Sequence, residues 1–151
     1  MVSRKFSLDD IEHGILRANS TKYMSLNRIF DKNDPRTKLS LHSIDPRVHF
    51  AFFIGAFDSP DFRAFSADNI EAELDLATQD YLRRSARLDE RKGKLKLPKQ
   101  FSWYRKDFGS DKDLIGFVSR HLADIDMRKK VIAQAGKLSI SHSDYDWRLR
   151  Q

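Results

Sequence analysis

The sequence predicts an α+β fold in which a small sheet is packed against about five helices. Apolar residues recur at helical spacing in several segments, and one short apolar run, residues 48–54, is rich in aromatic and β-branched side chains. A charged segment centred on Lys92-Gly93 predicts a hairpin near residues 87–97. We expect residues 1–151 to form a single domain, because a chain of this length can bury one core.

The first helix is expected over residues 7–17. Ser7 and Asp10 resemble a capping box, and the apolar side chains behind them fall on one face of a helix. Gly14 weakens this helix, so we expect another part of the backbone to approach it closely. Residues 19–38 are expected to be irregular.

The run at residues 48–54 follows the turn Asp45-Pro46 and is apolar on successive residues. A strand with this pattern is usually covered on both faces, so we expect it to be the central strand of the sheet. The clearest helix comes next, over residues 66–84, where apolar side chains recur at spacings of three and four residues.

The remaining elements follow the hairpin. A short aromatic helix is expected over residues 99–108, with Gly109 as its C-cap. Two amphipathic helices are expected over residues 111–122 and 124–135, and a final strand over residues 137–140.

The composition excludes several kinds of chemistry. The chain has no cysteine, which rules out disulfides, thiolate nucleophiles, zinc–thiolate sites and iron–sulfur clusters. No apolar run approaches the roughly 18 residues that a membrane-spanning helix needs. The start of the sequence has no apolar signal core, so we expect a soluble protein without a secretory signal, with the cytoplasm favoured. No motif indicates a cofactor, and the scattered histidines lack the spacing of a metal site.

The net charge of +6 is concentrated in residues 83–99, where eight basic residues outnumber two acidic ones. Such a stripe can attract nucleic acid or another anionic surface, although a solvated hairpin is the more common explanation. We favour the solvated hairpin and keep the other interpretation open. The candidate anion-binding residues are Arg17, Arg47, Arg83, Arg84, Arg87, Lys92 and Lys94.

Four short strings occur in an order that resembles one family. They are SLDDIEHGILR at residues 7–17, IDPRVHFA at 44–51, FSWYRKDFG at 101–109 and YDW at 145–147. Together they resemble the domain of unknown function 547, over roughly residues 6–149. The resemblance implies no reaction, because function resides in sites rather than in folds.

Two departures from the family bear on function. Family members usually carry two cysteines after the second string, whereas residues 52–55 and 58–61 here read FFIG and DSPD. Members also usually have an Asn-rich helical segment ahead of the first string, so we expect this chain to be the C-terminal portion of such a domain or a short member. If that segment normally covers the sheet, an apolar patch is left open, which predicts self-association or a protein partner.

His49 and His13 are the leading candidates for a general base, because both fall within the strings and imidazole titrates near neutral pH. Asp45 or Asp107 could orient either ring. A structural role for both histidines is the favoured alternative. Ser59 stands in the place of a family cysteine, but its Asp-Ser-Pro-Asp surroundings predict a turn rather than a nucleophile.

Three functional hypotheses remain from the sequence. The first is a non-catalytic interaction or scaffolding module. The second is a divergent hydrolase- or transferase-like enzyme that uses His49 with Asp45. The third is a binder of nucleic acid or of an anionic surface through residues 83–99.

Overall fold

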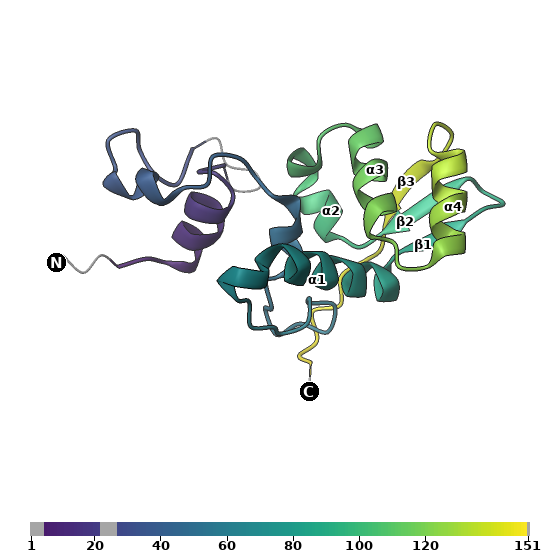
Figure 1. Ribbon diagram of the computed structural model, residues 1–151, viewed down its shortest axis with the longest axis horizontal. Coiled ribbons are helices and arrows are strands. Elements are labelled where there is room, and N and C mark those ends of the chain that lie inside the picture. The colour runs from purple at the N-terminus through teal and green to yellow at the C-terminus, as the bar shows by residue number, and fades with distance from the viewer. Residues whose placement is uncertain (1–4, 22–26, 151) are drawn as a thin grey trace. The chain divides into compact units, whose positions relative to one another are not determined.

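The computed structural model describes residues 5–21 and 27–150. Its backbone packing forms two compact units, Met1–Pro46 and Arg47–Gln151, and each is described on its own. The expectation of a single domain stays a prediction. The element order within the chain can be followed in Figure 1.

The first unit is built on a π-helix, η1 (Asp10–Leu16). Ser7 and Asp10 form the predicted capping box, because each backbone N–H donates to the other residue's side chain. Gly14 lies against the ring of Phe30, and a Cβ at this position would come within 2.4 Å of that ring. The close neighbour of Gly14 is therefore a side chain rather than the expected backbone. Of the expected irregular stretch, residues 22–26 lie outside the described residues, and a 3-10 helix, η2 (Pro35–Leu39), follows.

The second unit combines helices with a three-stranded sheet, which confirms the α+β class. Strands β1 (Arg87–Asp89) and β2 (Lys94–Leu97) form the predicted hairpin, and β3 (Ser139–His142) runs parallel to β2 at the opposite edge. The helices are α1 (Ile70–Ser85), α2 (Gln100–Trp103), α3 (Asp111–His121) and α4 (Ile125–Gln134). Short 3-10 turns are η3 (Pro46–Phe50), η4 (Ala67–Asn69) and η5 (Arg105–Phe108).

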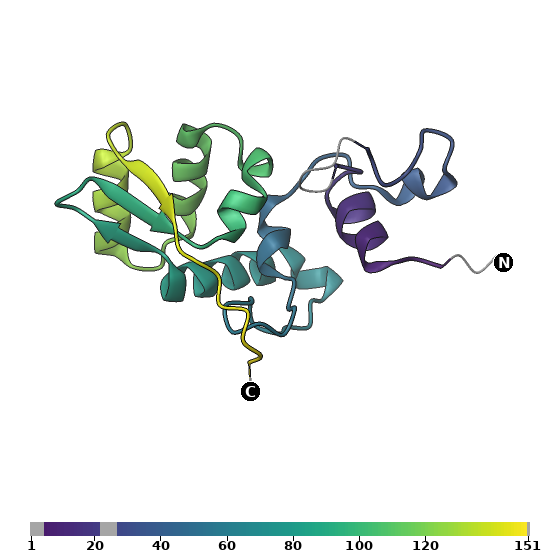
Figure 2. The ribbon, with the colours of Figure 1, turned by 180° about the vertical axis from the view of Figure 1, so that it is seen from behind.

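The core of the second unit lies between the sheet and the helices. Leu95 and Leu97 of β2 are fully buried against apolar side chains of α3 and α4, such as Leu114 and Val131. Figure 2 shows the strands in front of α3 and α4, so these helices cover only one face of the sheet. The other face is open to solvent, as the exposed alternate residues of β1 and β2 indicate.

The expected central strand at residues 48–54 is wrong. Its first half belongs to η3, and residues 51–54 form no strand. Pro46 fixes a backbone angle that suits the start of a 3-10 turn, and this turn inserts Phe50 into the aromatic core. The first half of the run is apolar because the turn enters the core. The second half lies at the surface, where Phe53 is 42% exposed.

We predict that Phe50→Ala lowers the free energy of unfolding by about 3–5 kcal/mol, because it empties a site between the rings of Tyr81, Phe101 and Phe117. Phe53→Ala is the matched control and should cost much less, since its side chain is half open to water. Urea denaturation monitored by circular dichroism measures both. Equal costs would contradict the buried turn.

Candidate functional site

A buried pair, His49 and Asp107, lies in the second unit. The His49 Nε2 donates to the Asp107 carboxylate Oδ2 over 2.9 Å, and the two side chains are 0% and 3% exposed. The ring of His49 stacks on that of Tyr104 with centroids 3.9 Å apart, and Phe108 lies beside it. The carboxylate and the stacked ring together fix the orientation of the imidazole, as happens for the histidine of catalytic dyads and for many structural histidines.

Local sequence explains how the two partners meet. His49 is carried by η3, which begins at Pro46, and Asp107 is carried by η5, which ends at Gly109. Gly109 has a φ of 71°, a conformation that favours glycine, and it caps η5. The single helix expected over residues 99–108 is wrong, because the segment is divided into α2 and η5. Because η5 ends at Gly109, the position of Asp107, two residues earlier, is also fixed.

Arg47, a candidate for anion binding, is held by carboxylates of α1. Its guanidinium donates to Glu71 over 2.5 Å and to Asp75 over 2.8 Å. The His121 Nε2 also lies 3.2 Å from Asp75. The hydrogen bond from Arg47, followed by that from His121, holds the pKa of Asp75 below its usual value of 3.8 despite partial burial. Sequence reasoning missed Asp75 and His121, and only the i, i+4 spacing of Glu71 and Asp75 on one helix face hinted at a shared cation.

The first unit holds His13 next to Arg17. The Nδ1 of His13 lies 2.7 Å from the Arg17 Nη1, and an arginine can only donate, so Nδ1 accepts and Nε2 carries the proton. Carboxylate oxygens of Asp9 and Glu12 lie 3.8 and 3.7 Å from the ring nitrogens. The half-buried Asp45 also belongs to this unit. His13 and Asp45 therefore lie in one unit, and His49, Asp107 and Ser59 in the other.

Ser59 is fully buried within a turn. Its Oγ accepts the N–H of Ile54 over 2.8 Å, and its carbonyl accepts from Arg84 over 2.6 Å. Tyr81 donates its hydroxyl to the neighbouring carbonyl of Asp58. These contacts fit a residue that ties the segment before α1 to that helix.

A pocket of about 410 Å³ lies beside this turn, lined in part by Tyr81, Arg84, Lys99 and Tyr145. Burial raises the pKa values of both tyrosines, so their hydroxyls remain protonated at neutral pH. Burial, and then the charges of Lys99 and Arg105, lower the pKa of His142 at the nearby end of β3. The pocket thus presents cations, but Asp58 and Asp144 also line it and offset its charge, and the Tyr81 hydroxyl already donates to the Asp58 carbonyl.

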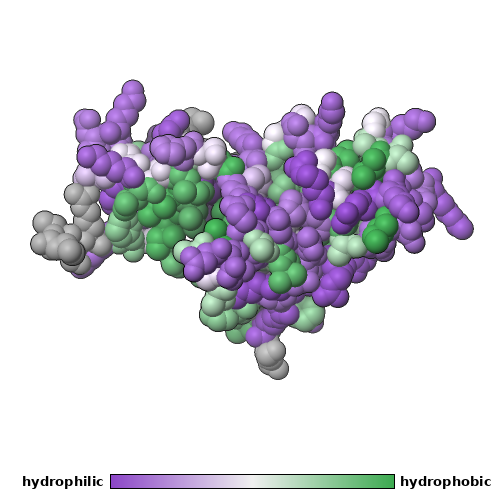
Figure 3. All heavy atoms as spheres, viewed as in Figure 1, coloured by the Kyte–Doolittle hydropathy of each residue, from purple (hydrophilic) through white to green (hydrophobic). Residues whose placement is uncertain are grey.

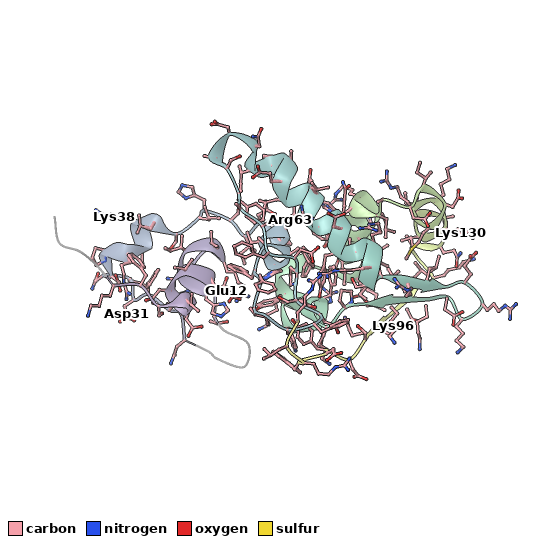
Figure 4. The ribbon with its side chains drawn as sticks, turned by 90° about the horizontal axis from the view of Figure 1, so that it is seen from below. Glu12, Asp31, Lys38, Arg63, Lys96 and Lys130 are labelled. Atoms are coloured by element: carbon pink, nitrogen blue, oxygen red, sulfur yellow. The ribbon has the colours of Figure 1, made fainter. Side chains whose placement is uncertain are left out.

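The other candidate anion-binding residues are spread over several elements. Arg83 is exposed on α1 near Asp80, and Lys92 lies near Asp89 in the turn of the hairpin. Arg87 and Lys94 lie on the open face of the sheet. Figure 4 shows Lys96 on the same side, away from α4, which carries Lys130. The structure therefore brings together only part of the predicted set.

Within residues 5–21 and 27–150, no group of three or more histidine, aspartate or glutamate side chains is placed to hold a metal ion. In the same part of the chain, no helix is both long and apolar enough to cross a bilayer.

A family model matches the chain over part of its length. The model described as "Protein of unknown function, DUF547" matches residues 2–82, more than half of the sequence. The chain therefore belongs to this family. The matched region contains the strings at 7–17 and 44–51, while the strings at 101–109 and 145–147 lie beyond it. No curated protein and no solved structure matches the chain.

We predict that Asp75→Asn destabilises the protein by about 0.5–1 kcal/mol at pH 7, because it weakens a partly exposed ion-pair network. The pKa of Asp75 is depressed in the folded state, so its stabilisation is complete above the unfolded pKa near 3.8 and disappears as pH falls through the lower folded value. Urea denaturation at pH 7 and at low pH should show that the difference in free energy of unfolding between wild type and variant disappears in acid. Asp68→Asn, at an exposed carboxylate before α1, is the control and should show no such gap.

Proposed function

We propose that this member of the DUF547 family is a non-catalytic interaction module that pairs with a second copy of itself through an apolar patch on the second unit. The patch consists of exposed side chains from residues 53–62 and from the C-terminal segment. Its members are Phe53, Ile54, Phe57, Phe62, Trp147 and Leu149.

The backbone beneath the patch is ordered by pairing between two distant segments. Ala56 and Leu149 form an antiparallel bridge, Phe57 N donates to the Arg148 carbonyl over 2.8 Å, and Arg150 N donates to the Gly55 carbonyl over 2.9 Å. A surface that is already ordered loses little conformational entropy on binding, which favours association. This pairing is the observation that carries the proposal.

The amount of exposed apolar surface suits a dimer. Phe62 and Leu149 are 80% and 82% exposed, and Figure 3 shows hydrophobic atoms at the lower edge of this unit, over the segment that precedes α1. Side chains of this size expose on the order of 100 Å² each, so six of them provide several hundred Å². Two copies together approach the roughly 1,200 Å² at which stable interfaces begin.

The charges around the patch favour a like partner over a strongly charged one. Asp61 forms ion pairs with Arg84 and Arg150, and Arg148 is paired with Asp146. Because these charges are neutralised within one molecule, two copies can approach without net repulsion. A partner of strong opposite charge would find little to complement at this rim.

The burial of the candidate catalytic groups supports a non-catalytic role. A general base must come within hydrogen-bond reach of its substrate, and a nucleophile must be accessible to it. The side chains of His49 and Asp107 are almost fully covered, and Ser59 is buried with its hydroxyl accepting a backbone N–H.

We predict that the protein dimerises with increasing concentration, as measured by size-exclusion chromatography with light scattering and by analytical ultracentrifugation. Phe62→Ser/Trp147→Ser should weaken the dimer by more than about thirtyfold, because the loss of a single hot-spot aromatic costs about 2 kcal/mol, which alone is a factor of about thirty. Ile125→Ser/Ile132→Ser, at exposed positions of α4, is the matched control and should leave the dimer intact. A monomer at every concentration, or equal weakening by both pairs, would refute the proposal.

A second candidate function is a hydrolase- or transferase-like enzyme, favoured by the 2.9 Å contact between His49 and Asp107. The sequence hypothesis used Asp45 as the carboxylate, and Asp107 takes that role here because it contacts the ring directly. The structural role predicts that Asp107→Ala costs about 3–5 kcal/mol of stability, since it breaks a buried ionisable pair.

The two functions are separated by a paired measurement of stability and activity. We expect the wild type to hydrolyse p-nitrophenyl acetate no faster than buffer does, and His49→Gln to lower the stability. Hydrolysis by the wild type that vanishes in a stably folded His49→Gln variant would establish the enzyme instead.

A further inference from the structure

We propose that the open face of the three-stranded sheet binds the phosphate backbone of a nucleic acid strand. This outer sheet face is independent of the apolar patch and shares no residue with it. Its members are Arg87 and Asp89 of β1, Lys94 and Lys96 of β2, and Ser139 and Ser141 of β3.

The pairing register gathers these side chains on one face. Arg87 lies opposite Lys96, and the parallel partner of Lys96 on β3 is Ser141. Paired residues point to the same side of a sheet, and alternate residues point to opposite sides. Leu88 and Leu95 therefore face the core, while the charged residues face solvent, as their burial shows.

The face carries more positive charge than its acidic residue can neutralise. Asp89 lies opposite Lys94 and also 3.8 Å from Lys92 in the turn. Arg87 and Lys96 are like charges directly opposite each other, an arrangement that costs stability. The Arg87 guanidinium donates to the carbonyls of Ala86 and Arg84, which bring no negative charge to the face, so a polyanion would offset the remaining repulsion.

The spacing of the cations suits a chain of phosphates. Lys94 and Lys96 are two residues apart on one strand, so their Cα atoms lie about 7 Å apart. This separation is comparable to that of successive phosphates along a nucleic acid strand. The small side chains of Ser139 and Ser141 leave the lysine amines unobstructed, and the Ser139 hydroxyl donates to the Gly93 carbonyl over 3.3 Å. The Ser141 hydroxyl is buried, so the contacts with phosphate come from the exposed cations.

The basic surface continues beyond the strands at the turn of the hairpin. Arg91 and Lys92 are exposed there, and the backbone of Lys137 lies next to Gly93, whose carbonyl accepts from Ser139 N. Figures 2 and 4 show no helix over this side of the sheet. A strand of nucleic acid can therefore lie along β2 and reach these further cations without any movement of the protein.

The chemistry of the face favours nucleic acid over a membrane or a protein. None of its six residues is apolar, whereas membrane-surface binding usually combines charge with inserted apolar side chains. Lysine is also depleted from the centres of protein interfaces. Sequence-independent contact with phosphates requires only what this face provides, namely exposed cations.

The test is fluorescence anisotropy with a labelled oligothymidylate of about 20 nucleotides, titrated between about 50 and 200 mM salt. We expect binding whose affinity falls steeply with salt. Lys94→Gln/Lys96→Gln should lower the affinity at about 50 mM salt at least about tenfold. The slope of log K against log salt concentration should fall in magnitude by about 1.4, because each phosphate contact on a single strand contributes about 0.7 to it. Lys94→Arg/Lys96→Arg should keep both values near those of the wild type.

The matched control removes the same charge from the helices that cover the opposite face. Lys112→Gln/Lys129→Gln, at exposed positions of α3 and α4, should retain the wild-type slope. Absent or salt-insensitive binding, equal loss in both glutamine pairs, or tighter binding to vesicles containing phosphatidylserine would each overturn the proposal. Circular dichroism melts should show that all variants fold, because every changed residue is exposed.

Discussion

The burial of Phe50 ties together the parts of the second unit that are far apart in the sequence. Its ring lies against Tyr81 of α1, Phe101 of α2 and Phe117 of α3. Because Phe50 ends the turn η3, this contact also sets the place of His49, one residue earlier, beside Tyr104 and Asp107. The candidate site is therefore a consequence of core packing, and a change in that packing would move the histidine as well.

The sequence predicts best where a structure depends on neighbouring residues. Ser110 and Asp113 form a complete capping box at the start of α3, and the side chain of Asp124 caps α4, so both helices begin near their expected positions. Gly93 supplies the positive φ in the turn of the hairpin. These signals span only a few residues, and no distant partner is needed to interpret them.

Prediction failed where the outcome depended on distant partners. The apolar run around Phe50 is compatible with a buried strand and with a buried turn, and the choice is made by aromatic residues at positions 81, 101 and 117. The contact between Asp75 and His121 joins residues 46 positions apart and has no local signal. The sequence offers both Asp45 and Asp107 as partners of His49, and only the fold brings Asp107 to the ring.

The two proposed surfaces can reinforce each other. A dimer formed through the apolar patch would carry two outer sheet faces in one assembly, and each face provides only a few phosphate contacts. When one face is bound to a strand, the second is held near the same strand at a high effective concentration, so the affinity of the pair exceeds that of either face. Weak and sequence-independent contacts of this kind become useful only when they are multiplied. Loss of the dimer should therefore weaken binding to long strands more than binding to short ones, even though no residue of the sheet is changed.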